Sequence, residues 1–89
     1  MANMVVTHGV GNMDAWLKGG AEREKLFASI CSSYRIYRQE GSNRVAIVSE
    51  NVDLEKMQAA MPTPEMQAAM KAHTVLEPFD IHIEIPGGK

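Results

Sequence analysis

The sequence is poor in cysteine, and Cys31 is the single one in 89 residues. One cysteine cannot form a disulfide within the chain, which favours a reducing compartment. No apolar run approaches the roughly 20 residues that a membrane-spanning helix needs. The first residues, Met-Ala-Asn-Met, lack the basic and long apolar regions of a signal peptide. We therefore expect a cytoplasmic protein with no membrane partner.

The sequence also lacks an excess of charge and the common catalytic motifs. Its net charge of −2 provides no basic surface for nucleic acid. Motifs of the P-loop, GxGxxG, CxxC, HExxH and GxSxG types are absent. Nucleotide chemistry, structural zinc and ordinary hydrolase mechanisms are therefore not expected. We predict no metal and no cofactor.

What the sequence does contain is an ordered series of elements. Patterns typical of strands and helices alternate as strand, helix, strand, strand, helix, strand. The expected ranges are 4–10, 13–31, 33–39, 44–50, 53–73 and 79–85. This order predicts one domain over residues 1–89 with an α+β, ferredoxin-like βαββαβ fold and a four-stranded antiparallel sheet.

Three local features add to this prediction. Gly19 and Gly20 lie inside the first helical stretch, so that helix breaks there or another group packs against its bare backbone. Both faces of strand 44–50 are apolar, which indicates that a second copy of the chain covers one side of the sheet. The seven methionines suit either an adaptable cavity wall or a plain core.

Several short segments resemble small members of the dimeric α/β-barrel superfamily, which includes the antibiotic biosynthesis monooxygenase-like proteins. The segments are Asp14-Ala15-Trp16, Tyr37-Arg38, Asn43-Arg44-Val45, Val52-Asp53-Leu54-Glu55, Thr63-Pro64-Glu65-Met66 and Val75-Leu76-Glu77-Pro78. The resemblance implies a homodimer in which two sheets pack face to face as a barrel. It also implies a cavity between sheet and helices that holds a small molecule.

The activities of that superfamily include cofactor-free oxidation of aromatic polyketides, cyclisation, isomerisation and haem degradation. Haem-degrading relatives use an asparagine on the first strand and a tryptophan and a histidine in the second helix. Asn3 could occupy the first of these roles, but His73 lies about one turn late for the third and the second helical stretch contains no tryptophan. The resemblance therefore favours cofactor-free chemistry over haem degradation.

Two histidines are the candidate catalytic bases. His8 shares the face of strand 4–10 that carries Met4, Val6 and Val10, and His73 continues the stripe of Met66 and Met70. A neutral imidazole near pH 7 is suited to act as a general base. The alternative for each is a structural role, as a hydrogen-bonded core residue for His8 and as a residue at a helix end for His73.

Other residues are candidates for binding a ligand or stabilising an oxyanion. Tyr34 and Tyr37 could donate to an oxyanion, while Trp16, Met66, Met70, Arg38 and His82 could contact the ligand. Each has a plainer alternative as a core residue or as part of a solvated face. A metal site of His8, His82 and a carboxylate would need the two histidines to share a face, and no compact ligand spacing supports it.

The sequence thus favours a small cofactor-independent enzyme, monooxygenase- or cyclase-like, that acts on a hydrophobic and aromatic or polyketide-like molecule. The alternative is a non-catalytic dimer that binds a small molecule or has a stress-associated role. A third reading is a module that uses the barrel only to dimerise, which requires an interior without a ligand-sized cavity.

Overall fold

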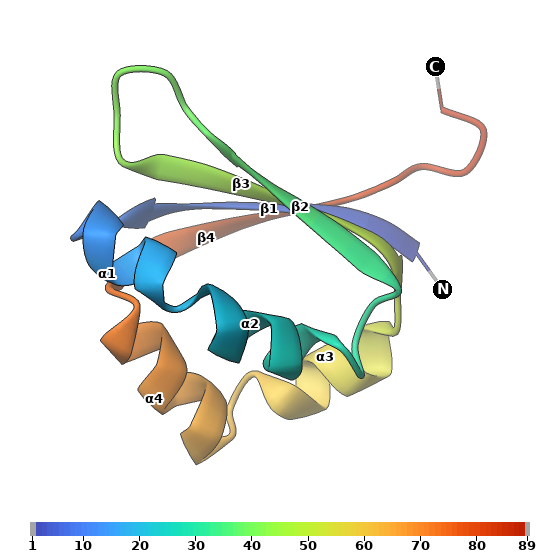
Figure 1. The fold of residues 1–89 in the computed structure, drawn as a ribbon. Coiled ribbons are helices and arrows are strands. Elements are labelled where there is room, and N and C mark those ends of the chain that lie inside the picture. Colours follow the sequence, from blue (N-terminus) through green and yellow to red (C-terminus); the bar gives the residue numbers. More distant parts are fainter. Residues whose placement is uncertain (1, 89) are drawn as a thin grey trace.

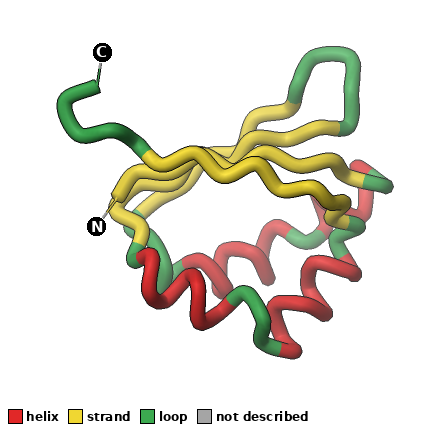
Figure 2. Tube along the Cα trace, turned by 180° about the vertical axis from the view of Figure 1, so that it is seen from behind, coloured by secondary structure: helices red, strands yellow, loops and turns green. Residues whose placement is uncertain are grey.

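Four antiparallel strands form one sheet, and the helices lie on one of its two faces in the computed structural model, which describes residues 2–88 (Figure 1). The view from behind shows the same two layers (Figure 2). The elements are β1 (Ala2–Val10), α1 (Met13–Lys18), α2 (Gly20–Phe27), β2 (Ser33–Arg38), β3 (Arg44–Val52), α3 (Leu54–Ala60), α4 (Pro64–Ala72) and β4 (Val75–Ile83).

The strand order across the sheet is β2-β3-β1-β4, and each neighbouring pair is antiparallel. This confirms the predicted ferredoxin-like α+β fold. The two long helical stretches that the sequence indicates are each divided, because α1 ends before Gly19 and α3 ends before Pro62. β4 begins at Val75 rather than at residue 79, because an edge strand tolerates a proline such as Pro78.

Side-chain caps start three of the helices. The Asn12 side chain accepts a hydrogen bond from the Ala15 amide at 3.1 Å, and Asp53 accepts one from Lys56 at 3.2 Å. Thr63 accepts one from the Met66 amide at 3.2 Å and precedes Pro64 at the first turn of α4. These bonds satisfy amides that have no partner within the helix, and so fix where each helix begins.

Two apolar clusters fill the space between the layers. One is centred on Met4, Ile30, Val52 and Met66, and the other on Val10, Trp16, Val45 and Ile47. Both clusters combine residues of the helices with the helix-facing side of β1 and β3. The functional question therefore concerns what lies between them.

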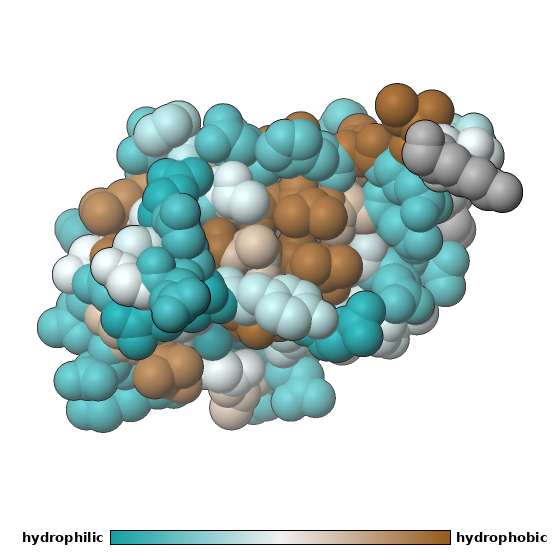
Figure 3. Space-filling model, turned by 90° about the horizontal axis from the view of Figure 1, so that it is seen from above, coloured by the Kyte–Doolittle hydropathy of each residue, from teal (hydrophilic) through white to brown (hydrophobic). Residues whose placement is uncertain are grey.

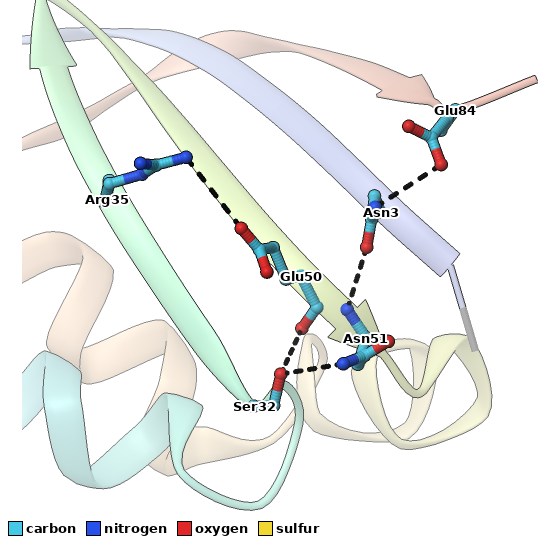
Figure 4. A network of polar contacts seen from close by, with 6 residues as sticks. All are labelled: Asn3, Ser32, Arg35, Glu50, Asn51 and Glu84. Carbon is cyan, nitrogen blue, oxygen red and sulfur yellow. Dashed lines mark hydrogen bonds and ion pairs between the residues drawn. The ribbon is translucent and has the colours of Figure 1, made fainter. Parts of the chain in front are cut away.

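Polar contacts hold the N-terminal end of β1 against the C-terminal end of β3 (Figure 4). The Asn3 side chain accepts a hydrogen bond from the Asn51 amide at 3.1 Å and donates one to Glu84 at 3.3 Å. The Asn51 side chain donates to Ser32 at 3.1 Å. Asn51 has a φ of 52°, in the left-handed region that asparagine tolerates, and it lies at the register shift between Ala2 and Met4.

The other face of the sheet carries no helix (Figure 1). The strand registers place Val5, Ala46, Val48, Tyr37 and Leu76 on it, since the residues that alternate with them face the helices. Tyr37 is 53% exposed and Leu76 is 48% exposed. A view onto this face shows apolar surface at its centre with polar residues around it (Figure 3).

Within residues 2–88, no helix combines the length and the apolar character needed to cross a membrane.

Candidate functional site

A cavity of about 150 Å³ lies between the sheet and the helices. Three strands and all the helices of the described chain contribute to its wall, and β2 does not. The wall is mainly apolar, and its buried polar side chains are those of His8, Arg23, Ser49 and His73. An apolar cavity of about this volume holds a molecule of the size of benzene.

His8 lies on the helix-facing side of β1 and is only 3% exposed. Its Nδ1 is 2.7 Å from the carbonyl oxygen of Gly9. Because a carbonyl can only accept, Nδ1 carries the hydrogen and Nε2 keeps its lone pair. Nε2 has no hydrogen-bond partner among residues 2–88, and part of its surface remains accessible. This geometry leaves a free acceptor on a residue of the cavity wall.

The surroundings of His8 favour its neutral form. Burial lowers the pKa of the imidazole below 6.5, and the hydrogen bond to Gly9 opposes this effect. The charges of Arg44 and Arg23 lower the pKa further. The ring also packs edge-on against Trp16 and Phe79, at centroid distances of 5.0 and 5.8 Å. His8 is therefore neutral and held in place at pH 7.

Trp16 and Arg23 form a stacked pair beside His8. The Arg23 guanidinium carbon lies 3.8 Å from the centroid of the Trp16 ring, a cation–π contact. Nη1 and Nη2 of Arg23 both donate to the Trp16 carbonyl oxygen at 3.1 Å. These bonds cap the end of α1 from the neighbouring helix α2. The indole also makes edge-on contacts with His8 and His73, at centroid distances of 5.0 and 6.4 Å.

His73 ends α4 and packs against the break between α1 and α2. It is 7% exposed, and its ring centroid is 6.4 Å from that of Trp16. A Cβ on Gly19 would overlap this ring, so the absence of a side chain at Gly19 makes room for His73. Both readings of the glycine pair therefore apply, since the helix breaks there and a neighbouring ring packs on its backbone.

The charge state of His73 follows from its neighbours. Burial lowers its pKa below 6.5, and Arg23 lowers it further. The Glu22 carboxylate, 3.8 Å from Nε2 and 58% exposed, raises it in part. We assign the neutral form at pH 7, because burial, the largest of the three effects, lowers the pKa.

The structure brings five of the residues predicted from sequence to the cavity wall and leaves four elsewhere. His8, His73, Trp16, Met66 and Met70 line the cavity. The four that do not line it are Tyr34, Tyr37, Arg38 and His82.

Each of those four has a clear location. Tyr34 packs edge-on against Phe27 at 5.0 Å. Tyr37 lies on the outer face of the sheet, and Arg38 donates to the Ser42 carbonyl and the Asn43 side chain in the β2–β3 turn. His82 is opposite Val5 in the sheet, whereas the helix-facing Val6 is opposite Ile81. His82 and His8 therefore lie on opposite faces of the sheet and cannot share a ligand.

Arg23 is the charged residue of the described cavity wall, and the sequence analysis did not assign it to the site. It falls near one stripe of the first helical stretch with Trp16 and Ile30, which are both buried. Charged residues are rarely buried, so a solvent-exposed position was the default expectation. Among residues 2–88 no group of three histidine, cysteine or acidic side chains is placed to hold a metal ion.

Comparison with known proteins identifies the fold. No protein-family profile and no curated protein matches the sequence. A solved Bordetella bronchiseptica structure, named "Putative antibiotic biosynthesis monooxygenase", is 20% identical with a TM-score of 0.73, and the match covers 94% of each chain. A Caulobacter crescentus structure of the same name is 14% identical with a TM-score of 0.69, covering 93% of this chain and 86% of that one.

An uncharacterised NIPSNAP domain protein of Burkholderia xenovorans is also similar, at 16% identity with a TM-score of 0.68 over 97% of this chain and 94% of that one. Identities this low establish the fold and leave the activity open. The resemblance found in the sequence is thus confirmed for the architecture: the chain has the ferredoxin-like fold shared with proteins named as antibiotic biosynthesis monooxygenases.

Proposed function

We propose that the chain is a cofactor-independent enzyme that acts on a small aromatic molecule bound between the sheet and the helices, with His8 as its general base. The observation that carries this proposal is the His8 side chain, which is buried and neutral, is oriented by the Gly9 carbonyl and has a free Nε2 lone pair. A base held this way can take a proton from a phenol, an enol or an acidic C–H group.

The proton moves to Nε2 of His8, and the electron pair stays on the ligand as a delocalised anion. In an isomerisation or cyclisation the proton returns to another atom. In a cofactor-free oxygenation of a CH₂ group, the anion reduces O₂. One oxygen atom enters the ligand as a carbonyl and the other leaves as water. The apolar wall keeps bulk water away from the anion, which strengthens nearby electrostatic interactions.

His73 is the second polar group of this proposal. It shares the Trp16 ring with His8 and lies at the break between α1 and α2. Its neutral ring can donate one hydrogen bond to an oxyanion or pass a proton on. Tyr34 and Tyr37 have no part in this arrangement, because neither lines the cavity.

The test follows a panel of one-ring enolisable ketones and hydroquinones in air and in D₂O, without added cofactor. Oxygen uptake and deuterium incorporation are measured for the wild type and for His8→Gln. Glutamine can keep the bond to Gly9 but cannot act as a base. We expect at least one compound to react on the order of 100-fold faster with the wild type, the lower end of general-base effects. His82→Gln, on the opposite sheet face, is the matched control.

The second candidate is a non-catalytic binding protein, which the largely apolar wall supports. If compounds bind the wild type but none reacts faster with the wild type than with His8→Gln, the enzyme proposal is refuted and the binding-protein proposal remains. Binding is followed by changes in the Trp16 fluorescence. An absence of both binding and reaction would refute both readings.

We also propose a homodimer that forms through the uncovered sheet face. Support comes from the apolar residues on that face, among them Val5, Ala46 and Val48 (Figure 3). Val48→Lys places a charge at its centre and should convert a dimer into a monomer, measured by light scattering after gel filtration. Lys56→Met, on the exposed side of α3, is the control. A wild-type protein that is monomeric at 100 μM would contradict the proposal.

A further inference from the structure

Arg23 is a buried cation without a carboxylate partner. It is 5% exposed. The ion pairs among residues 2–88 are Arg35–Glu50, Arg44–Asp80 and His73–Glu22, and none includes Arg23. Burying a charge is costly unless the charge is paired, so a buried arginine without an acidic partner is unusual in a protein.

The hydrogen bonds of Arg23 are also incomplete. A guanidinium has five N–H donors. Nη1 and Nη2 each donate once to the Trp16 carbonyl oxygen, at 3.1 Å. Nε is fully buried and has no acceptor among residues 2–88. The indole face of Trp16, 3.8 Å from the guanidinium carbon, offsets part of the positive charge. The guanidinium therefore has a positive charge without an acidic partner and N–H groups without an acceptor among the described residues.

Arg23 lies on the cavity wall, and none of the wall residues that the structure describes carries a negative charge. His8 and His73 are neutral there, and their pKa values are lowered in part by Arg23 itself. Burial raises the pKa of the wall thiol Cys31, which keeps it protonated. The acidic neighbour Glu22 is 58% exposed and lies beside His73. The cavity thus carries one uncompensated positive charge in largely apolar surroundings.

We infer that the cavity binds a one-ring aromatic acid, or an equally small apolar molecule with one anionic oxygen group, and that this group is the counter-ion of Arg23. The cavity volume of about 150 Å³ limits the apolar part to roughly one ring. A carboxylate accepts charge-assisted hydrogen bonds from a guanidinium, and Nη1 and Nη2 of Arg23 each keep one N–H group that the Trp16 carbonyl oxygen does not use. The inference rests on the proposed function, since it names the ligand class of the same cavity.

The arrangement also links Arg23 to the chemistry. A proton transfer to His8 would create a second cation on the cavity wall, which burial disfavours most and the charges of Arg44 and Arg23 disfavour further. An anionic ligand in the cavity would offset the part of this penalty that comes from charge repulsion. Arg23 is in this view a binding residue whose charge favours the anionic state of the ligand.

Benzoate and its neutral isostere benzamide are the probes. Their dissociation constants for the full-length protein are measured at pH 7 by NMR titration, with the ring signals of His8 and Trp16 as reporters. We expect benzoate to bind at least tenfold more tightly than benzamide. Arg23→Met should weaken benzoate binding at least tenfold and leave benzamide binding within threefold. Arg35→Met, on the outer sheet face, is the matched control and should change neither.

The outcomes separate this inference from the proposed function. If benzamide binds as tightly as benzoate, the inference is refuted, while the aromatic cavity ligand remains. If neither probe binds at 20 mM, the inference is refuted together with the cavity as a ligand site. The wild-type comparison needs no variant, so it decides even if Arg23→Met does not fold. Arg23→Lys, which keeps the charge, should retain part of the preference for benzoate.

Discussion

Gly19→Ala is the change that tests most directly how the site is built into the fold. Gly19 has φ −81° and ψ 5°, which any residue can adopt, so alanine meets no backbone penalty there. The new Cβ would instead lie 2.6 Å from Cε1 of His73 and closer still to two other atoms of that ring. Because His73 is 7% exposed and packs on Trp16, its ring would have to leave that contact and move toward the cavity that it lines.

The expected size of the effect follows from two opposing contributions. Forcing an extra methyl group into a packed region costs about 1–3 kcal/mol. Replacing glycine by alanine also lowers the entropy of the unfolded chain, which stabilises by about 0.4–1 kcal/mol. The net destabilisation is then about 0–2.6 kcal/mol, with a midpoint of about 1.3 kcal/mol. For a domain of this size the midpoint corresponds to a fall in Tm of roughly 5–10 °C.

The measurement is urea unfolding followed by circular dichroism, at one protein concentration for all variants because a dimer would make stability concentration-dependent. Gly20→Ala is the matched control. A Cβ there meets only Nη2 of Arg23, at 3.9 Å, so this variant should be as stable as the wild type or more stable. In a His73→Ala background, Gly19→Ala should no longer destabilise. Equal losses with and without the His73 ring would refute the reasoning.

Two further predictions concern pH and the β1–β3 end of the sheet. His8 and His73 both have pKa values lowered by burial, so the unfolded chain binds protons before the folded one does, and stability should fall as the pH drops below 6.5. Urea midpoints at pH 7 and pH 5 measure this, and His8→Gln should flatten the dependence; an unchanged slope would contradict it. Asn51→Ala should cost about 1–3 kcal/mol, because it loses the bond to Ser32 and puts alanine, which tolerates the left-handed region less well than asparagine, at a φ of 52°. Asn51→Gly relieves only the backbone part and should therefore lie between the wild type and Asn51→Ala in urea midpoint, an order that a purely side-chain effect would not produce.

Most of the fold was predictable because its signals are local. The alternation of Phe79, Ile81 and Ile83, the caps at Asn12, Asp53 and Thr63, and the glycine pair all act within a few residues. Their positions in the structure agree with the sequence patterns. The start of β4 was missed because Pro78 reads as a strand breaker. A proline is tolerated in an edge strand, and that β4 lies at the sheet edge is a property of the whole fold.

The candidate site was predictable in part for the same reason. Periodicity placed His8 and His73 on apolar faces, and these faces meet in the structure. Alternation in a strand defines two faces but does not say which one receives the helices. Tyr37 therefore could not be assigned from sequence, and it lies on the outer face. Arg23 was missed because a charged residue is expected to face solvent, and the stacking on Trp16 that accompanies its burial is a tertiary contact.

The cavity has a consequence for how a ligand can be found. The cavity of about 150 Å³ belongs to the folded chain and is lost on unfolding. A molecule that fills it therefore binds the folded state and stabilises it by mass action, by about 2.7 kcal/mol at 100 times its Kd. Occupancy and melting temperature are therefore coupled in this protein. A thermal-shift screen of small aromatic acids would reveal its ligand before any reaction is known.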